Sequence, residues 1–189
     1  MKQNQLKTIK MPKNNLNNFL MLLLDDKTYT EELVQLIKRV KDKSENICYV
    51  CLSKPYTDVI DNLKNEQINH DNFTFIDIFS SHNYELKDLE NCIFVRDSEN
   101  LEEIGTAVRK AVTNKQCSTI VFDSISTLLI YQKVDSIVKF TYDLLSDKKQ
   151  KKAHKIYLLM KGMGIYKDES TNLINDLRLF ADKVIDVKD

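Results

Sequence analysis

The residues best placed to do chemistry stand at the end of an apolar run, Thr119–Asp123, which is followed by Ser124 and Ser126. Carboxylate oxygens are ligands that Mg²⁺ prefers, so an Asp at the end of a buried strand can hold such an ion. The same side chain can instead cap the turn that follows, with the two serine hydroxyls bonded to turn backbone. The pattern alone leaves both interpretations open.

A second polar segment, residues 24–31, follows the first apolar run and reads Leu-Asp-Asp-Lys-Thr-Tyr-Thr-Glu. It offers two carboxylates, a cation at Lys27, and hydroxyls at Thr28 and Thr30. The Thr28-x-x-Glu31 spacing predicts a capping box at the start of a helix. No glycine precedes Gly105 in the chain, so this segment has no residue that enters left-handed backbone conformations without strain.

The cysteines and histidines give a weaker signal for metal or redox chemistry. Cys48-x-x-Cys51 lies in the apolar run 47–52, which predicts a buried strand whose residues three apart point to opposite faces. No second closely spaced pair completes a tetrahedral site. The histidines, far apart in the sequence and without spaced ligand partners, are His70, His82 and His154.

Apolar runs of strand length alternate with amphipathic stretches of helix length along most of the chain. Strands are predicted at residues 18–24, 47–52, 73–77, 92–95, 119–123, 155–160 and 184–187. Helices are predicted at residues 30–40, 55–64, 101–112, 134–145 and 171–180. Helical crossovers between apolar strands favour a mostly parallel sheet flanked by helices on both faces, which is a three-layer α/β fold.

Length and charge bound the class of protein. The 189 residues suit one domain, predicted at 18–189, and residues 1–17 are rich in Lys, Asn and Gln and predict a flexible or capping arm. Basic and acidic residues number 28 each, so the zero net charge gives no reason to expect nucleic acid or anionic lipid as a partner. With no export signal and no apolar run long enough to span a bilayer, we expect a cytoplasmic protein.

The ordered set of strand ends resembles the RecA/KaiC-like ATPases, a superfamily with the P-loop NTPase fold. Residues 119–131, Thr-Ile-Val-Phe-Asp-Ser-Ile-Ser-Thr-Leu-Leu-Ile-Tyr, resemble the family's Walker B strand. The Asp of that strand positions a magnesium ion directly or through water, and Asp123 is the matching residue. Residues 47–63, 155–160 and 180–187 are similar to the family's second strand, to the strand after the Walker B helix and to its closing strand.

The same resemblance places residues 24–31 where the family carries its phosphate-binding loop, Gly-x-x-x-x-Gly-Lys-Thr. Thr30 stands at the lysine position and Glu31 at the position of the metal-binding hydroxyl, while Asp25 and Asp26 add negative charge. Like charges a few ångströms apart cost about 1–4 kcal/mol at effective dielectric constants of about 80 to 20. The segment is therefore a degenerate Walker A position.

A second departure concerns the catalytic carboxylate, which in the family usually follows the second strand. Ser53 and Lys54 stand there, so a bound nucleotide would lack its general base. These departures predict a pseudo-ATPase that acts as a regulatory or assembly module and needs no cofactor. Because family members assemble side by side into rings, the resemblance implies self-association or a related active ATPase as the partner.

Two alternatives remain open. One is a weak or unconventional ATP-binding protein or ATPase that holds Mg²⁺ at Asp123 and uses Lys27 or Lys54 as the phosphate cation. The residues that would line its ATP/Mg site are Lys27, Thr28, Thr30, Asp123 and Ser124. The other is a response-regulator-like domain with an acidic magnesium pocket, although seven predicted strands exceed the five usual for that fold.

Overall fold

The computed structural model describes residues 18–25, 27–81, 86–148, 150 and 152–187. The predicted arm, residues 1–17, lies outside this part of the chain, as do Asp26 and His82. The strands are β1 (Phe19–Leu24), β2 (Ile47–Cys51), β3 (Phe73–Asp77), β4 (Cys92–Phe94), β5 (Thr119–Asp123), β6 (His154–Met160) and β7 (Lys183–Asp186). The α-helices are α1 (Tyr29–Lys41), α2 (Tyr56–Asn65), α3 (Leu101–Asn114), α4 (Val134–Ser146) and α5 (Lys167–Arg178).

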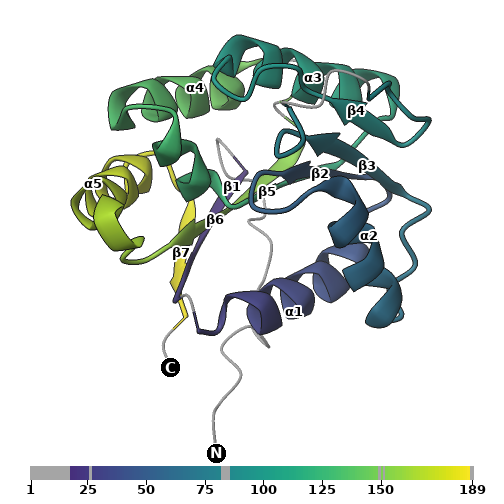
Figure 1. Cartoon of the computed structure of the whole chain (residues 1–189), viewed down its shortest axis with the longest axis horizontal. Helices are drawn as coiled ribbons and strands as arrows, with labels where there is room; N and C mark the ends of the chain where they lie inside the picture. The colour runs from purple at the N-terminus through teal and green to yellow at the C-terminus, as the bar shows by residue number, and fades with distance from the viewer. Residues whose placement is uncertain (1–17, 26, 82–85, 149, 151, 188–189) are drawn as a thin grey trace, which may run out of the picture.

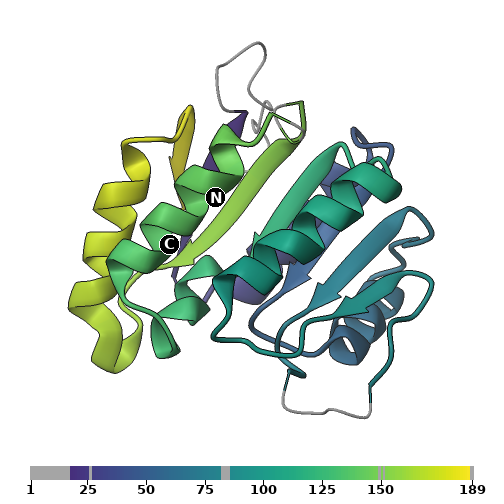
Figure 2. The same ribbon diagram turned by 90° about the horizontal axis from the view of Figure 1, so that it is seen from above.

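The strands form a single sheet in the order β4-β3-β2-β5-β6-β1-β7, and every neighbouring pair is parallel. Figure 1 shows α1 and α2 on one face of this sheet and α3 and α4 on the other, and Figure 2 shows α5 beside α4 on that second face. The predicted fold class, a parallel three-layer α/β domain, is confirmed. No helix in the described residues is both long and apolar enough to cross a bilayer.

Burial on both faces explains why the strands read as continuous apolar runs. In β1 the side chains of Phe19, Met21 and Leu23 join the core beneath α3, α4 and α5. Leu20, Leu22 and Leu24 join the core beneath α1 and α2. Cys48 and Cys51 likewise fall into different cores, which confirms that this pair points to opposite faces of a buried strand.

The element predictions differ from the structure mainly after β5 and β6. Two 3₁₀ helices, η2 (Ile125–Ile130) and η3 (Gly164–Tyr166), were not predicted because their sequences lack a helical period long enough to detect. Helix α5 begins at Lys167 rather than at Thr171. Its first turn holds Asp168 and Glu169, whose charges favour the positive end of the helix dipole.

Candidate functional site

Because all strands are parallel, their carboxyl ends lie along one edge of the sheet, where ligands bind in folds of this class. Strand β6 lies between β1 and β5, so the ends of these two strands are about 10 Å apart at the usual strand spacing. The segment after β1 and the segment after β5 therefore face one another across the end of β6.

The connection from β1 to α1 is a short turn. The backbone N–H of Thr28 donates to the carbonyl of Asp25 at 3.1 Å, and the Thr28 hydroxyl donates to the same carbonyl at 3.3 Å. Helix α1 begins at the next residue, Tyr29. The predicted capping box is wrong, because the Thr28 side chain bonds back into the turn and makes no capping bond to the helix. Lys27, in the same turn, is exposed.

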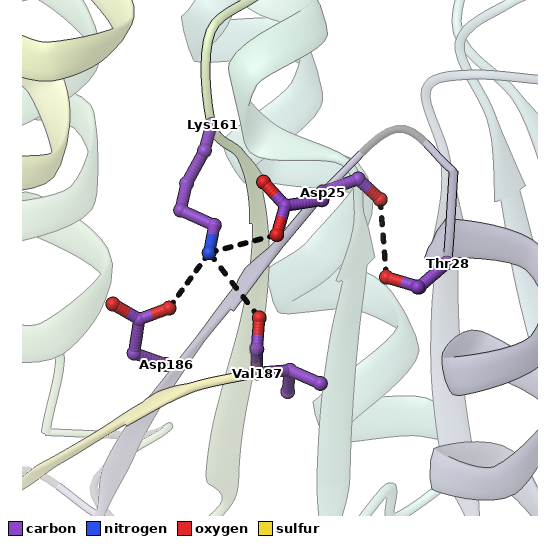
Figure 3. A network of polar contacts seen from close by, with 5 residues as sticks. All are labelled: Asp25, Thr28, Lys161, Asp186 and Val187. Carbon is purple, nitrogen blue, oxygen red and sulfur yellow. Dashed lines mark hydrogen bonds and ion pairs between the residues drawn. The ribbon is translucent and has the colours of Figure 1, made fainter. Parts of the chain in front are cut away.

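A lysine that the sequence analysis did not single out ties the ends of β1, β6 and β7 together (Figure 3). The Nζ of Lys161, directly after β6, lies 3.0 Å from Oδ2 of Asp25 and 2.8 Å from Oδ1 of Asp186. It also donates to the carbonyl of Val187 at 3.2 Å. Partial burial acts to lower the pKa of Lys161, but the hydrogen bonds to Asp186 and Asp25 outweigh it and raise that pKa. This cation is already neutralised by protein carboxylates.

Asp123, at the end of β5, is buried with 1% of its surface exposed. Its Oδ1 accepts hydrogen bonds from the Tyr29 hydroxyl and, at 3.2 Å, from the Ser53 hydroxyl. Its Oδ2 accepts a hydrogen bond from the Tyr49 hydroxyl. Burial raises the pKa of this carboxyl to about 7. Both carboxyl oxygens are thus occupied by hydroxyl groups of the protein.

Three elements deliver these hydroxyls. Tyr29 is the first residue of α1, and the short turn after β1 brings its side chain over the sheet. Strand β2 pairs with β5 so that Cys51 lies opposite Asp123, and Tyr49 projects from the same face two residues earlier. The backbone N–H groups of Leu52 and Ser53 donate to the Asp123 carbonyl at 2.9 and 3.1 Å, which fixes the Ser53 hydroxyl nearby.

The hydroxyls of the two serines after Asp123 bond to β6, so the interpretation in which they bond to turn backbone is wrong. The Ser124 hydroxyl donates to the carbonyl of Leu158 at 3.0 Å, and the Ser126 hydroxyl accepts from the N–H of Met160 at 3.1 Å. Both bonds reach β6, because η2 folds back over the end of that strand. Ser124 is fully buried and is engaged in holding the sheet edge.

A pocket of about 240 Å³ lies between α1 and α2 and has Asp123 in its lining. Thr30 and Lys54 also line it, so the structure brings these two predicted residues to the same cavity as Asp123. Lys27, Thr28 and Ser124 do not line this pocket. The tyrosines were missed, although a Tyr within a buried strand signals a hydroxyl that needs an internal partner.

Comparison with sequence models of protein families finds no match, and no curated protein sequence matches the chain. Among solved structures, the chain is similar to a KaiC-like protein from the hyperthermophilic archaeon Pyrococcus horikoshii, with a TM-score of 0.57 and 14% sequence identity. The match covers 90% of this chain and 71% of that protein's chain. This likeness supports the RecA/KaiC-like fold, and at this identity it shows the fold alone.

Proposed function

We propose that the chain is a non-catalytic RecA/KaiC-like domain that acts as a regulatory or assembly module by binding protein. The proposal is carried by the hydrogen bonds of Asp123. The carboxyl that corresponds to the metal-positioning group accepts bonds from Tyr29, Tyr49 and Ser53. A magnesium ion would have to displace a tyrosine hydroxyl from a carboxyl group that is 1% exposed.

The turn after β1 supports the same proposal. A phosphate-binding loop presents several backbone N–H groups outward, toward the anion. In this chain the N–H and the hydroxyl of Thr28 both donate inward, to the carbonyl of Asp25. The nearby ammonium of Lys161 is bonded to two carboxylates and a carbonyl, so its charge is not left over for a phosphate.

Nucleotide binding is tested by titrating a fluorescent ATP analogue in the presence of Mg²⁺, with an active KaiC-like ATPase as the positive control. We expect no saturable signal. The lining shared by Thr30, Lys54 and Asp123 gives the alternative its physical basis. Magnesium-dependent ATP turnover that is lost in Asp123→Ala would make the ATPase alternative correct.

The binding function needs its own measurement. Sedimentation velocity over a range of concentrations detects self-association, which the zero net charge mildly favours. Mixing with a related active ATPase from the same organism detects a mixed assembly. We expect a stable complex in one of the two experiments. A chain that stays monomeric in both contradicts an assembly role.

A further inference from the structure

The pocket between α1 and α2 has an apolar body. Its walls are Leu33, Val34 and Ile37 from α1 and Val59 and Leu63 from α2, which face one another across the cavity. Tyr49 contributes to the lining from β2. A cavity of about 240 Å³ has room for a small organic molecule, since one water takes up about 30 Å³ in the liquid. An apolar lining with a few polar groups is typical of small-molecule sites.

The polar groups of the pocket are unevenly paired. Glu66 forms an ion pair of 2.9 Å with Lys38, which joins the two helices at one end of the pocket. The carboxyl oxygens of Asp123 accept bonds from three hydroxyls. Lys54 and the Thr30 hydroxyl have no hydrogen bond or ion pair with any residue in the described part of the chain.

Charge complementarity follows from this pairing. Lys54 also borders a shallow hollow beside Asp58 and Asp61, yet it forms an ion pair with neither in the described structure. The pocket therefore offers one unpaired ammonium, with a hydroxyl donor from Thr30 and the amide of Asn62 in the same lining. A ligand that matches it has an apolar body and a single anionic head that accepts hydrogen bonds.

We propose that this pocket binds a small monocarboxylic acid with a branched aliphatic or aromatic body, whose carboxylate pairs with Lys54. The apolar body lies between the two helices, where it further buries the half-buried side chains of Leu33 and Val34. Thr30, Lys54 and Asp123 are also the residues on which the ATPase alternative depends, so the carboxylate proposal rests on the proposed non-catalytic function, and the probes are titrated in the absence of nucleotide.

The first test compares three probes with the same branched six-carbon skeleton and different head groups: 4-methylpentanoate, 4-methylpentanamide and 4-methylpentylamine. Backbone amide chemical shifts of the full chain are followed during each titration. We expect saturable shifts from the carboxylate that map to α1 and α2, and at least tenfold weaker binding of the amide and the amine. Equal binding of the three probes, shifts that map elsewhere, or no saturable shift overturns the proposal.

Variants separate the charge from the cavity. Lys54→Met keeps an unbranched side chain of similar length and removes the charge. Binding of the carboxylate should therefore weaken at least tenfold, while binding of the neutral amide is unchanged. The matched control is Lys64→Met, also on this side of the molecule, with a side chain that is 61% exposed and lies 3.9 Å from Asp61. Val34→Trp should block the pocket for every probe. Unchanged carboxylate affinity in Lys54→Met contradicts the assignment.

Discussion

At the scale of the residue, Asp123 shows how a strand-end carboxyl can serve structure. A carboxyl withdrawn from water must take its hydrogen bonds from the protein, since an unpaired buried charge costs far more than the bond gains. The hydroxyls of Tyr29, Tyr49 and Ser53 come from α1, β2 and the segment after β2. Asp123 therefore links three segments that are separate in the sequence.

The raised pKa of Asp123 predicts a pH dependence of stability. Its value is about 7 in the folded chain, above the ordinary 3.8, so the folded state binds this proton more tightly than the unfolded state. The contribution of this group is then full below pH 4 and is lost as the pH rises through 7. A rise in the pKa from 3.8 to about 7 corresponds to a loss of about 4 kcal/mol. This value is an upper bound, because the hydrogen bonds that the hydroxyls donate favour the ionised carboxylate.

This dependence is measured by urea unfolding between pH 4 and 8. The difference in unfolding free energy between the natural chain and Asp123→Asn should fall with rising pH and level off above pH 7. Asp61→Asn, at an exposed position, controls for the loss of one charge. Parallel curves for the natural chain and Asp123→Asn across the whole range would show that the pKa of Asp123 is not raised.

Removal of one hydroxyl isolates a single bond of this group. Tyr29→Phe leaves Oδ1 of Asp123 with Ser53 alone, and a buried acceptor that loses a donor costs about 1–3 kcal/mol. Tyr142→Phe is the matched control, because that side chain is 54% exposed. Chemical denaturation should show the loss for Tyr29→Phe and a change within about 0.5 kcal/mol for the control. Equal stabilities would mean that the Tyr29 bond contributes nothing.

At the scale of the element, the ends of β1, β6 and β7 are joined through Lys161. Asp25 and Asp186 approach the same ammonium, so its removal leaves two carboxylates near one another without a cation (Figure 3). The groups are about one quarter to two fifths exposed, so solvent screens the interaction in part. The network is stronger than a surface ion pair because one donor serves three acceptors.

Lys161→Met should lower the free energy of unfolding by about 1–2 kcal/mol. At 1 M salt the screening length is about 3 Å, so salt weakens the attraction between Lys161 and the two carboxylates. The free energy of unfolding of the natural chain should therefore fall more in 1 M NaCl than that of Lys161→Met. Lys64→Met, whose ion pair is exposed, should stay near the natural stability. If salt changed the free energy of unfolding of Lys161→Met and of Lys64→Met by the same amount, a stabilising role for the Lys161 network would be contradicted.

How far the sequence predicts this architecture depends on the range of the interaction. The strands were predictable because both faces of the sheet are covered, which leaves an apolar run for each strand. Asp123 was predictable as a strand-end carboxyl. Its partners Tyr29 and Tyr49 were not, because a hydroxyl 94 or 74 residues away is chosen by the packing of α1 and by strand register. Lys161 escaped notice for the same reason.

The wrong prediction in the turn after β1, the capping box, concerned residues that are close together in the sequence. A capping box and a turn that bonds Thr28 back to Asp25 use the same hydroxyl, and the Thr28-x-x-Glu31 pattern does not distinguish them. The backbone of Thr28, with φ −105° and ψ −7°, is closer to helical than to the extended conformation of a capping residue. A local sequence pattern therefore indicates which groups can form a hydrogen bond, and the backbone conformation determines which of the possible bonds forms.

At the scale of the whole molecule, the sheet lies between two hydrophobic cores, and each strand contributes side chains to both. Leu22 lies in the core beneath α1 and α2, and its neighbour Leu23 lies in the core beneath α3, α4 and α5. Because each strand supplies side chains to both cores, neither core can form unless the sheet has formed. The two cores should therefore unfold together, in the manner of a single cooperative domain.

Leu22→Ala and Leu23→Ala test this cooperativity, since each empties a site in one core only. Each should lower the free energy of unfolding by about 2–5 kcal/mol, and amide hydrogen exchange should accelerate equally in the slowest amides of α1 and of α3. Leu179→Ala, at a position that is 82% exposed, should change neither. If Leu22→Ala accelerated exchange in α1 while α3 stayed protected, the face with α1 and α2 would open by itself. A partner could then bind there through local opening, whereas a single transition requires any binding surface to exist already in the folded chain.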